Sequence, residues 1–143
     1  MSRSGYNDDG DDTWGLIRWR GAVSSAMRGK RGQAFLREML AAMDAMPERR
    51  LLAVTINTEQ GCCAIGTVTR ARGIDTSDLD GIDPYDDYGH TATALAKRVG
   101  IASAMAREIV FANDEGAWGN ETPEGRWTRM RQWIIEQLVE QPA

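Results

Sequence analysis

The segment 33–46 carries its apolar side chains at the spacing of an α-helix, and this pattern constrains the fold more than any other feature. Phe35, Met39 and Met43 recur every four residues, which places them on one helical face. Pro47 ends the pattern, because the residue before a proline avoids the helical conformation. A methionine-rich face can be a binding surface, but it is more often part of a core. We therefore expect a helix here that buries this face.

Most of the remaining chain also predicts helices. Apolar residues at helical spacing favour helices over 16–27, 64–72, 91–99 and 102–113. Gly73 follows the second of these at a position suited to a left-handed cap. The last helix begins at Thr122-Pro123-Glu124, which combines a capping hydroxyl, a first-turn proline and a carboxylate near the positive end of the helix dipole. We expect it to run to about residue 140.

One short β-hairpin is predicted between the helices. Residues 51–57 contain Val54, Thr55 and Ile56, which favour a strand, and residues 59–61 can turn the chain back toward Cys62 and Cys63. Such a hairpin needs a helix to pack against. The predicted fold class is mainly α: a compact bundle of five or six helices with one short β-hairpin.

The chain of 143 residues is long enough for one core and short enough for one domain. Residues 1–13 contain four aspartates and predict a flexible acidic lead-in, and residues 14–143 predict a single α-rich domain. No apolar run reaches the roughly 18 residues that a membrane-spanning helix needs, and no secretion signal precedes the domain. We therefore expect a cytoplasmic protein that does not bind membranes.

Positive charge is concentrated in the first third of the chain. The formal net charge is −4, but residues 14–50 carry eight basic and three acidic side chains, whereas residues 51–90 carry two and seven. The basic segment 28–32 has two glycines and precedes a helix start, a combination that favours anions. An ordinary solvated turn is the alternative, since the full phosphate-loop spacing is absent. The predicted binding residues are Arg18, Trp19, Arg20, Arg28, Lys30, Arg31 and Gln33.

Residues 93–112 have the outline of a helix-turn-helix. Two short apolar-faced helices meet at a break at Gly100 and Ile101, as in many DNA-reading motifs. The residues of the second helix that could face a DNA groove include the acidic Glu108 and few side chains that can read bases. A turn between two helices that does not bind DNA is therefore the stronger interpretation. The alternative nucleic-acid-binding residues are Lys97, Arg98, Ser103 and Arg107.

The chain offers few residues for catalysis or metal binding. Cys62 and Cys63 are adjacent, which disfavours a mutual disulfide and suits buried, unreactive thiols. His90 has no nucleophile near it in sequence, and the acidic segment 75–90 lacks the bidentate glutamate of a calcium loop. Acidic residues at 114–115 oppose the dipole of the helix that they end, which suggests either an internal ion pair with the basic third of the chain or contact with a partner, and we favour the ion pair. We expect no catalytic residues, metal or cofactor.

Several segments together resemble a group of small proteins carried by phages and prophages of proteobacteria. They are Arg20-Gly-Ala-Val, 28–33, Cys63-Ala-Ile-Gly, Arg72-Gly-Ile-Asp, 108–115, and Glu121-Thr-Pro-Glu with Arg126-Trp127. A looser resemblance, through 63–66, 113–114 and the last helix, is to an actinobacterial family. Neither carries an activity or catalytic residues that could be transferred. The first implies an accessory gene of a mobile element.

These observations together predict a non-enzymatic phage or prophage accessory protein. We expect it to bind a host protein or a protein–nucleic-acid complex through its basic face, with counter-defence as one such role. The alternative is a nucleic-acid-binding regulator that uses residues 93–112. The oligomeric state stays open.

Overall fold

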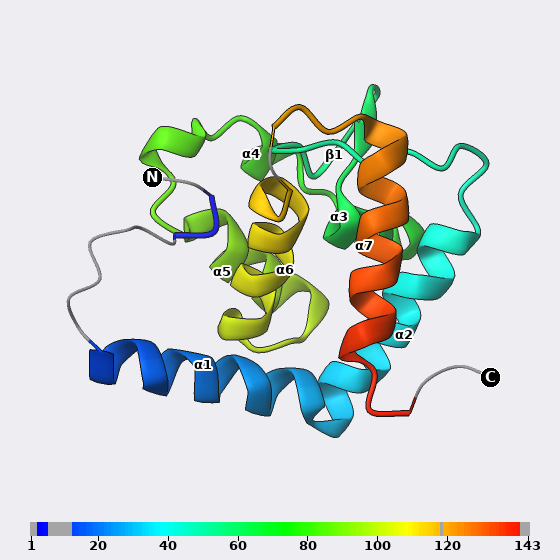
Figure 1. Ribbon diagram of the computed structural model, residues 1–143. Helices are drawn as coiled ribbons and strands as arrows, with labels where there is room; N and C mark the ends of the chain where they lie inside the picture. Colours follow the sequence, from blue (N-terminus) through cyan, green and yellow to red (C-terminus); the bar gives the residue numbers. More distant parts are fainter. Residues whose placement is uncertain (1–2, 6–12, 118, 141–143) are drawn as a thin grey trace.

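The computed structural model contains seven α-helices and one two-stranded hairpin among the residues that it describes, which are 3–5, 13–117 and 119–140 (Figure 1). The side chains of residues 13 and 14 are not described. In chain order the elements are α1 (Thr13–Arg28), α2 (Lys30–Asp44), β1 (Asn57–Thr58), β2 (Gly61–Cys62), α3 (Ala64–Arg72), α4 (Ser77–Asp80), the 3-10 turn η1 (Pro84–Asp86), α5 (His90–Val99), α6 (Ser103–Glu115) and α7 (Pro123–Gln137).

Helix α6 lies at the centre of the bundle, in contact with α1, α3, α5 and α7 (Figure 1). Its residues Met105, Ile109 and Val110 are fully buried in one core that extends to every other long helix. Helix α1 runs along the lower edge of the molecule in Figure 1, and α2 and α7 lie side by side at the right, where α1 ends. The predicted mainly α fold with one short hairpin is confirmed.

Helix α2 has the predicted buried face but begins earlier than predicted. Phe35, Met39 and Met43 are buried, as the sequence pattern indicates. The helix starts at Lys30 because only Gly29 separates it from α1, and the amide of Gln33 still donates to the carbonyl of Gly29. The predicted caps of two other helices are also confirmed: Gly73 ends α3 with a φ of 71°, and the Thr122 hydroxyl accepts a hydrogen bond at the start of α7.

The strand predicted over 51–57 is wrong for most of its length. Only Asn57 and Thr58 pair with the returning strand. Val54 has a φ of 63°, a left-handed conformation that a strand cannot contain. The amide of Leu51 donates to the carbonyl of Pro123 at the start of α7, and the amide of Leu52 donates to the carbonyl of Cys62, so the segment is held by isolated bonds on two sides rather than by a regular ladder.

The N-terminal segment is not a lead-in throughout. The prediction covered residues 1–13, but Arg3 and Ser4 are buried at 2% and 1% exposure. Arg3 forms an ion pair with Asp114 at the end of α6, with 2.5 Å between Nε and Oδ2. Residues 1–2 and 6–12 lie outside the described part of the chain, and α1 already begins at Thr13.

Part of the acidic segment 75–90 folds onto the molecule through its carboxylates. The carboxylate of Asp80 accepts hydrogen bonds from the amides of Ile56 and Asn57, at 2.6 and 3.1 Å. Asp87 is buried and accepts from the amide and the hydroxyl of Thr91 in the first turn of α5. These carboxylates therefore hold the α5 start and the hairpin in place.

Candidate functional site: a cationic ridge on α1 and α2

Five basic side chains follow α1 and the first turn of α2, and we call them the cationic ridge. All five are exposed, and in the described part of the chain none forms an ion pair with an acidic residue. They are Arg18, Arg20, Arg28, Lys30 and Arg31. The acidic segment 75–90 does not neutralise them, since its one described ion pair joins Asp78 to Arg98 of α5.

Arginines elsewhere on the molecule are mostly neutralised by carboxylates. Arg72 binds Glu38 at 2.6 Å, Arg131 binds Asp44 at 2.8 Å, and Arg129 binds Glu121 at 2.7 Å. The pKa of each carboxyl partner is held below its usual value, mainly by the hydrogen bonds from these arginines and to a lesser extent by their positive charge. The ridge therefore gathers on neighbouring elements five basic side chains that have no acidic partner in the described part of the chain, whereas most arginines elsewhere there are paired.

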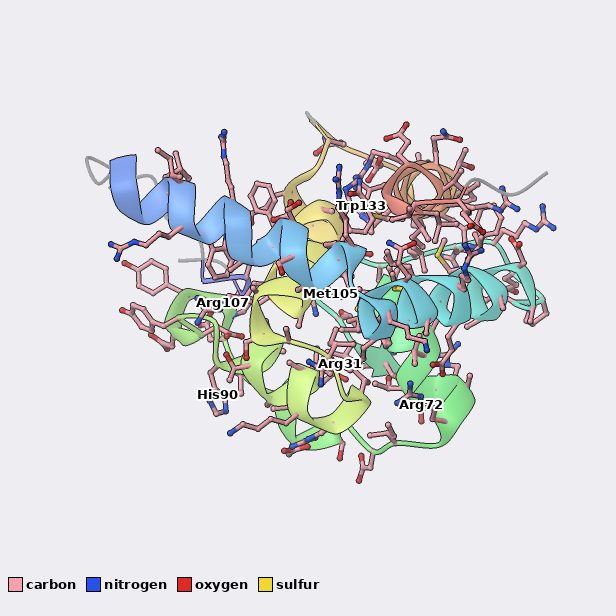
Figure 2. All side chains as sticks on the ribbon, turned by 90° about the horizontal axis from the view of Figure 1, so that it is seen from below. Arg31, Arg72, His90, Met105, Arg107 and Trp133 are labelled. Carbon is pink, nitrogen blue, oxygen red and sulfur yellow. The ribbon has the colours of Figure 1, made fainter. Side chains whose placement is uncertain are left out.

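The ridge is not a flat basic face. Arg18 and Arg20 are two positions apart on a helix, so their side chains project to opposite sides of α1. Leu16 and Ile17, in the turn before them, are 49% and 54% exposed. The ridge therefore presents apolar and cationic side chains together, on a helix that runs along one edge of the molecule (Figure 1). Figure 2 shows Arg31 near the junction of α1 and α2.

The first turn of α2 does not form the open anion cradle that the glycines suggested. A Cβ atom on Gly32 would lie 1.9 Å from the carbonyl oxygen of Ala26 in α1. Gly32 is therefore needed for the close packing of two helices, and the backbone of α1 lies where its side chain would be. This glycine is not a point at which a ligand approaches the backbone closely.

Gln33, a predicted binding residue, holds the fold together instead. Its Nε2 donates to the carbonyls of Met27 and Gln137, at 2.7 and 3.0 Å. Its Oε1 accepts from the amide of Val139 at 2.9 Å. These bonds join the end of α1 to the end of α7, so the side chain has no free group for a ligand.

Trp19 and Arg107 come from the two separately predicted sites, and the fold brings them together. The guanidinium carbon of Arg107 lies 5.6 Å from the centroid of the Trp19 ring, a cation–π contact between α6 and α1. Figure 2 shows Arg107 beside α1, with His90 farther from that helix. Sequence separation hides this contact, and no local pattern around either residue predicts it.

The helix-turn-helix outline is real as secondary structure but is badly placed for reading DNA. Helices α5 and α6 meet at Gly100, which has a φ of 80°. The second helix of such a motif must enter a groove, whereas α6 is the central helix and α1 lies against it. Arg98 is held by Asp78, Arg107 packs on α1, and only Lys97 and Ser103 of the four predicted residues are exposed.

The carboxylate at the end of α6 forms the predicted internal ion pair, with a partner that the sequence did not indicate. The prediction placed the partner of Asp114 in the basic third of the chain, and the structure places it at Arg3. The same carboxylate accepts from the amide of Val54 at 3.0 Å. The neighbouring Asn113 bonds the amide of Ala64 and the carbonyl of Leu52, so this corner joins four segments.

Cys62 and Cys63 are free, fully buried thiols, as predicted. Burial, with a further contribution from Cys63, raises the pKa of Cys62 to about 11, so this thiol is protonated at neutral pH. Cys63 lies beside the Arg3 guanidinium. Burial lowers the pKa of this guanidinium, but Cys63 and the bonds to Asp114 raise the pKa by more, so that it lies above its usual value. Among the described residues, no three His, Cys, Asp or Glu side chains gather as metal ligands would.

A shallow groove of about 410 Å³ lies between the end of α2 and α3, away from the ridge. Its lining is largely apolar and includes Met46, Leu52 and Cys62. Arg70 at its edge is held by Asn57 and Thr58, with 2.8 Å between its Nε and the Asn57 Oδ1. No reactive set of side chains lines the groove, and we do not assign it a ligand.

Glu121 supports a pH prediction, because its carboxylate is 12% exposed and sits between Arg129 and Arg126. The hydrogen bond with Arg129 lowers the pKa of the Glu121 carboxyl in the folded protein below its value in the unfolded chain, which is about 4.3. The charged carboxylate therefore stabilises the folded protein above that pH, and this stabilisation is lost as the pH falls through the folded pKa. Glu121→Gln should therefore destabilise the protein by about 1–2 kcal/mol at neutral pH and by less in acid. Thermal unfolding of both proteins from about pH 6 to 3 measures the difference, with Glu59→Gln in the exposed hairpin turn as control. A difference that does not shrink in acid contradicts this role.

Comparison with known proteins adds no family. No family model matches the chain, and no curated protein or solved structure is similar to it. None of the described helices is long and apolar enough to cross a membrane. The function must therefore be inferred from the ridge and its surroundings.

Proposed function

We propose that this protein acts by binding an acidic surface of another protein through its cationic ridge, without catalysis of its own. The observation that carries the proposal is the contrast in charge pairing. Most arginines on α3, α5 and α7 are paired with carboxylates of the same chain, whereas the five ridge cations are exposed and unpaired within the described residues. The paired arginines are Arg72, Arg98, Arg126, Arg129 and Arg131. Unneutralised charge concentrated in one region of a protein surface speeds association with an oppositely charged partner.

A protein partner fits the ridge better than a nucleic acid does. Protein interfaces are enriched in tryptophan and arginine around apolar side chains, and the ridge has exposed Leu16 and Ile17 beside Arg18 and Arg20. Interfaces for nucleic acids are more polar and much more positive. The net charge of −4 and the opposite directions of the two arginines on α1 do not supply such a surface.

The resemblance to phage and prophage proteins supports a biological setting for this binding. An accessory protein of a mobile element meets its partners inside the bacterial host, in the cytoplasm. We propose a host protein, alone or bound to nucleic acid, as the partner, and counter-defence as a role of this kind. The helix-turn-helix alternative has less support, because α1 and the core cover α6.

The test is capture of a partner from a bacterial lysate with charge-reversed variants. The ridge variant carries Arg28→Glu, Lys30→Glu and Arg31→Glu, and the control carries Lys97→Glu, an exposed cation away from the ridge. We expect the wild type and the control to retain the same stoichiometric partner, and the ridge variant to lose at least about tenfold in affinity, equal to 1.4 kcal/mol. Titration calorimetry with the purified partner measures this.

Two results would contradict the proposal. Equal capture by all three proteins shows that the ridge is not the interface. Capture that disappears after nuclease treatment, and that Lys97→Glu also weakens, identifies the nucleic-acid regulator instead, since such binding falls steeply with salt.

A further inference from the structure

Arg107 is a partly buried cation whose charge is not neutralised by any carboxylate in the described part of the chain. Its Nε is buried and has no hydrogen-bond partner there. A buried donor without an acceptor is destabilising, and native structures leave few of them. Arg72, Arg98, Arg129 and Arg131 each use their Nε or terminal nitrogens to bind a carboxylate, so Arg107 stands apart from them.

Packing fixes the guanidinium of Arg107 in one place. The Trp19 ring lies on it at 5.6 Å, and the Cα of Gly89 faces it closely enough that a Cβ there would lie 3.1–3.2 Å from three guanidinium atoms. A guanidinium stacked in this way has already lost much of its side-chain freedom. Binding an anion then costs less entropy than it would for a free surface arginine.

The surroundings of Arg107 favour a peptide over a small inorganic anion. Tyr88, which directly precedes Gly89, is 61% exposed and has a φ of 50°, and Tyr85 is 72% exposed. These tyrosines belong to the loop whose Gly89 packs on Arg107, and exposed tyrosines provide apolar contact and hydrogen bonds together, as protein-binding surfaces do. Arg18 and Arg20 flank Trp19 on α1 and add positive charge on both sides.

From these observations, we infer that Arg107, stacked on Trp19, binds a carboxylate side chain in an acidic segment of the partner protein. The inference rests on the proposed function and names Arg107 as the residue that binds the partner's carboxylate directly. The terminal nitrogens of Arg107 donate to the carboxylate, since its Nε is enclosed. The ridge cations attract the segment at longer range, and Arg107 selects where it sits.

The test uses ¹⁵N-labelled full-length protein and two short synthetic peptides, one of glutamate and one of glutamine. The buried Nε–H of Arg107 gives its own NMR signal, which Arg107→Lys removes and so assigns. We expect this signal to shift saturably with the glutamate peptide and to stay fixed with the glutamine peptide and with inorganic phosphate at equal concentration. We expect Arg107→Gln to weaken peptide binding about tenfold, with Arg107→Lys recovering little because a lysine lacks the planar fork.

The outcomes separate this inference from the proposed function. Shifts at the ridge residues without a shift at the Arg107 Nε overturn the inference and leave the ridge as the binding site. A response to phosphate equal to that of the peptide overturns the choice of a carboxylate. No shift anywhere contradicts both proposals. Because the wild-type titration needs no substitution, a variant that fails to fold does not affect the result.

Discussion

Asp114→Ala should lower the free energy of unfolding by about 3–5 kcal/mol, the cost of breaking a buried ion pair by removing one partner. The side chains of Arg3 and Asp114 are 3% and 6% exposed, so the substitution leaves a buried guanidinium without its acceptor. The amide of Val54 loses an acceptor as well. Urea unfolding followed by circular dichroism measures the change.

A double-mutant cycle with Arg3→Met isolates the pair from the other bonds of Asp114. We expect the two substitutions together to cost less than the sum of their separate costs, because the double variant has no uncompensated charge from this pair. Arg50→Met is the matched control, since this arginine is 43% exposed and lies 3.3 Å from Glu124. A loss below about 1 kcal/mol for Asp114→Ala would show that residues 3–5 are not anchored through this ion pair.

Gly32→Ala should destabilise the protein by about 3 kcal/mol, the upper end of the cost of overpacking. The added methyl group would meet the carbonyl oxygen of Ala26 at 1.9 Å, and a backbone atom cannot yield as a flexible side chain can. The junction between α1 and α2 would have to open. Thermal and urea unfolding measure the effect.

Gly21→Ala is the matched control and should have the opposite sign. Gly21 is exposed in the middle of α1, and a Cβ there would meet nothing within 4 Å. Alanine should stabilise the helix by about 0.5–1 kcal/mol, because it loses less backbone freedom on folding than glycine does. If both substitutions were neutral, the close contact of α1 and α2 would not contribute to stability.

Much of the fold could be predicted from local sequence. The apolar stripe of α2, the Gly73 cap and the Thr122 start of α7 are each set by a few neighbouring residues, and the structure confirms all three. The prediction of a strand over 51–57 was wrong, because contacts with residues far away in sequence set the path of this segment. Its residues have β propensity, but the hydrogen bond from Leu51 to the start of α7 and the left-handed conformation of Val54 outweigh it.

The candidate site was predictable in part. A concentration of basic residues in 14–50 pointed to the region of the ridge. Which of those residues have no acidic partner depends on the segments that pack beside them in the folded protein. Gln33 was predicted to bind a ligand, but its side chain is used in hydrogen bonds within the protein. The sequence predicted Arg107 as a residue that could bind nucleic acid, whereas in the structure its guanidinium contacts the ring of Trp19 on another helix.

By itself, the sequence determined the helical periods, most helix ends and the segregation of charge along the chain. These depend on interactions between residues at most a few positions apart, so a linear pattern records them. Only the tertiary structure decided that Arg3 meets Asp114, that Trp19 meets Arg107, and that the ridge cations have no acidic partner among the described residues. Packing around α6 brings together side chains that are up to 111 positions apart, and no local rule gives the partner of a charge across such a distance.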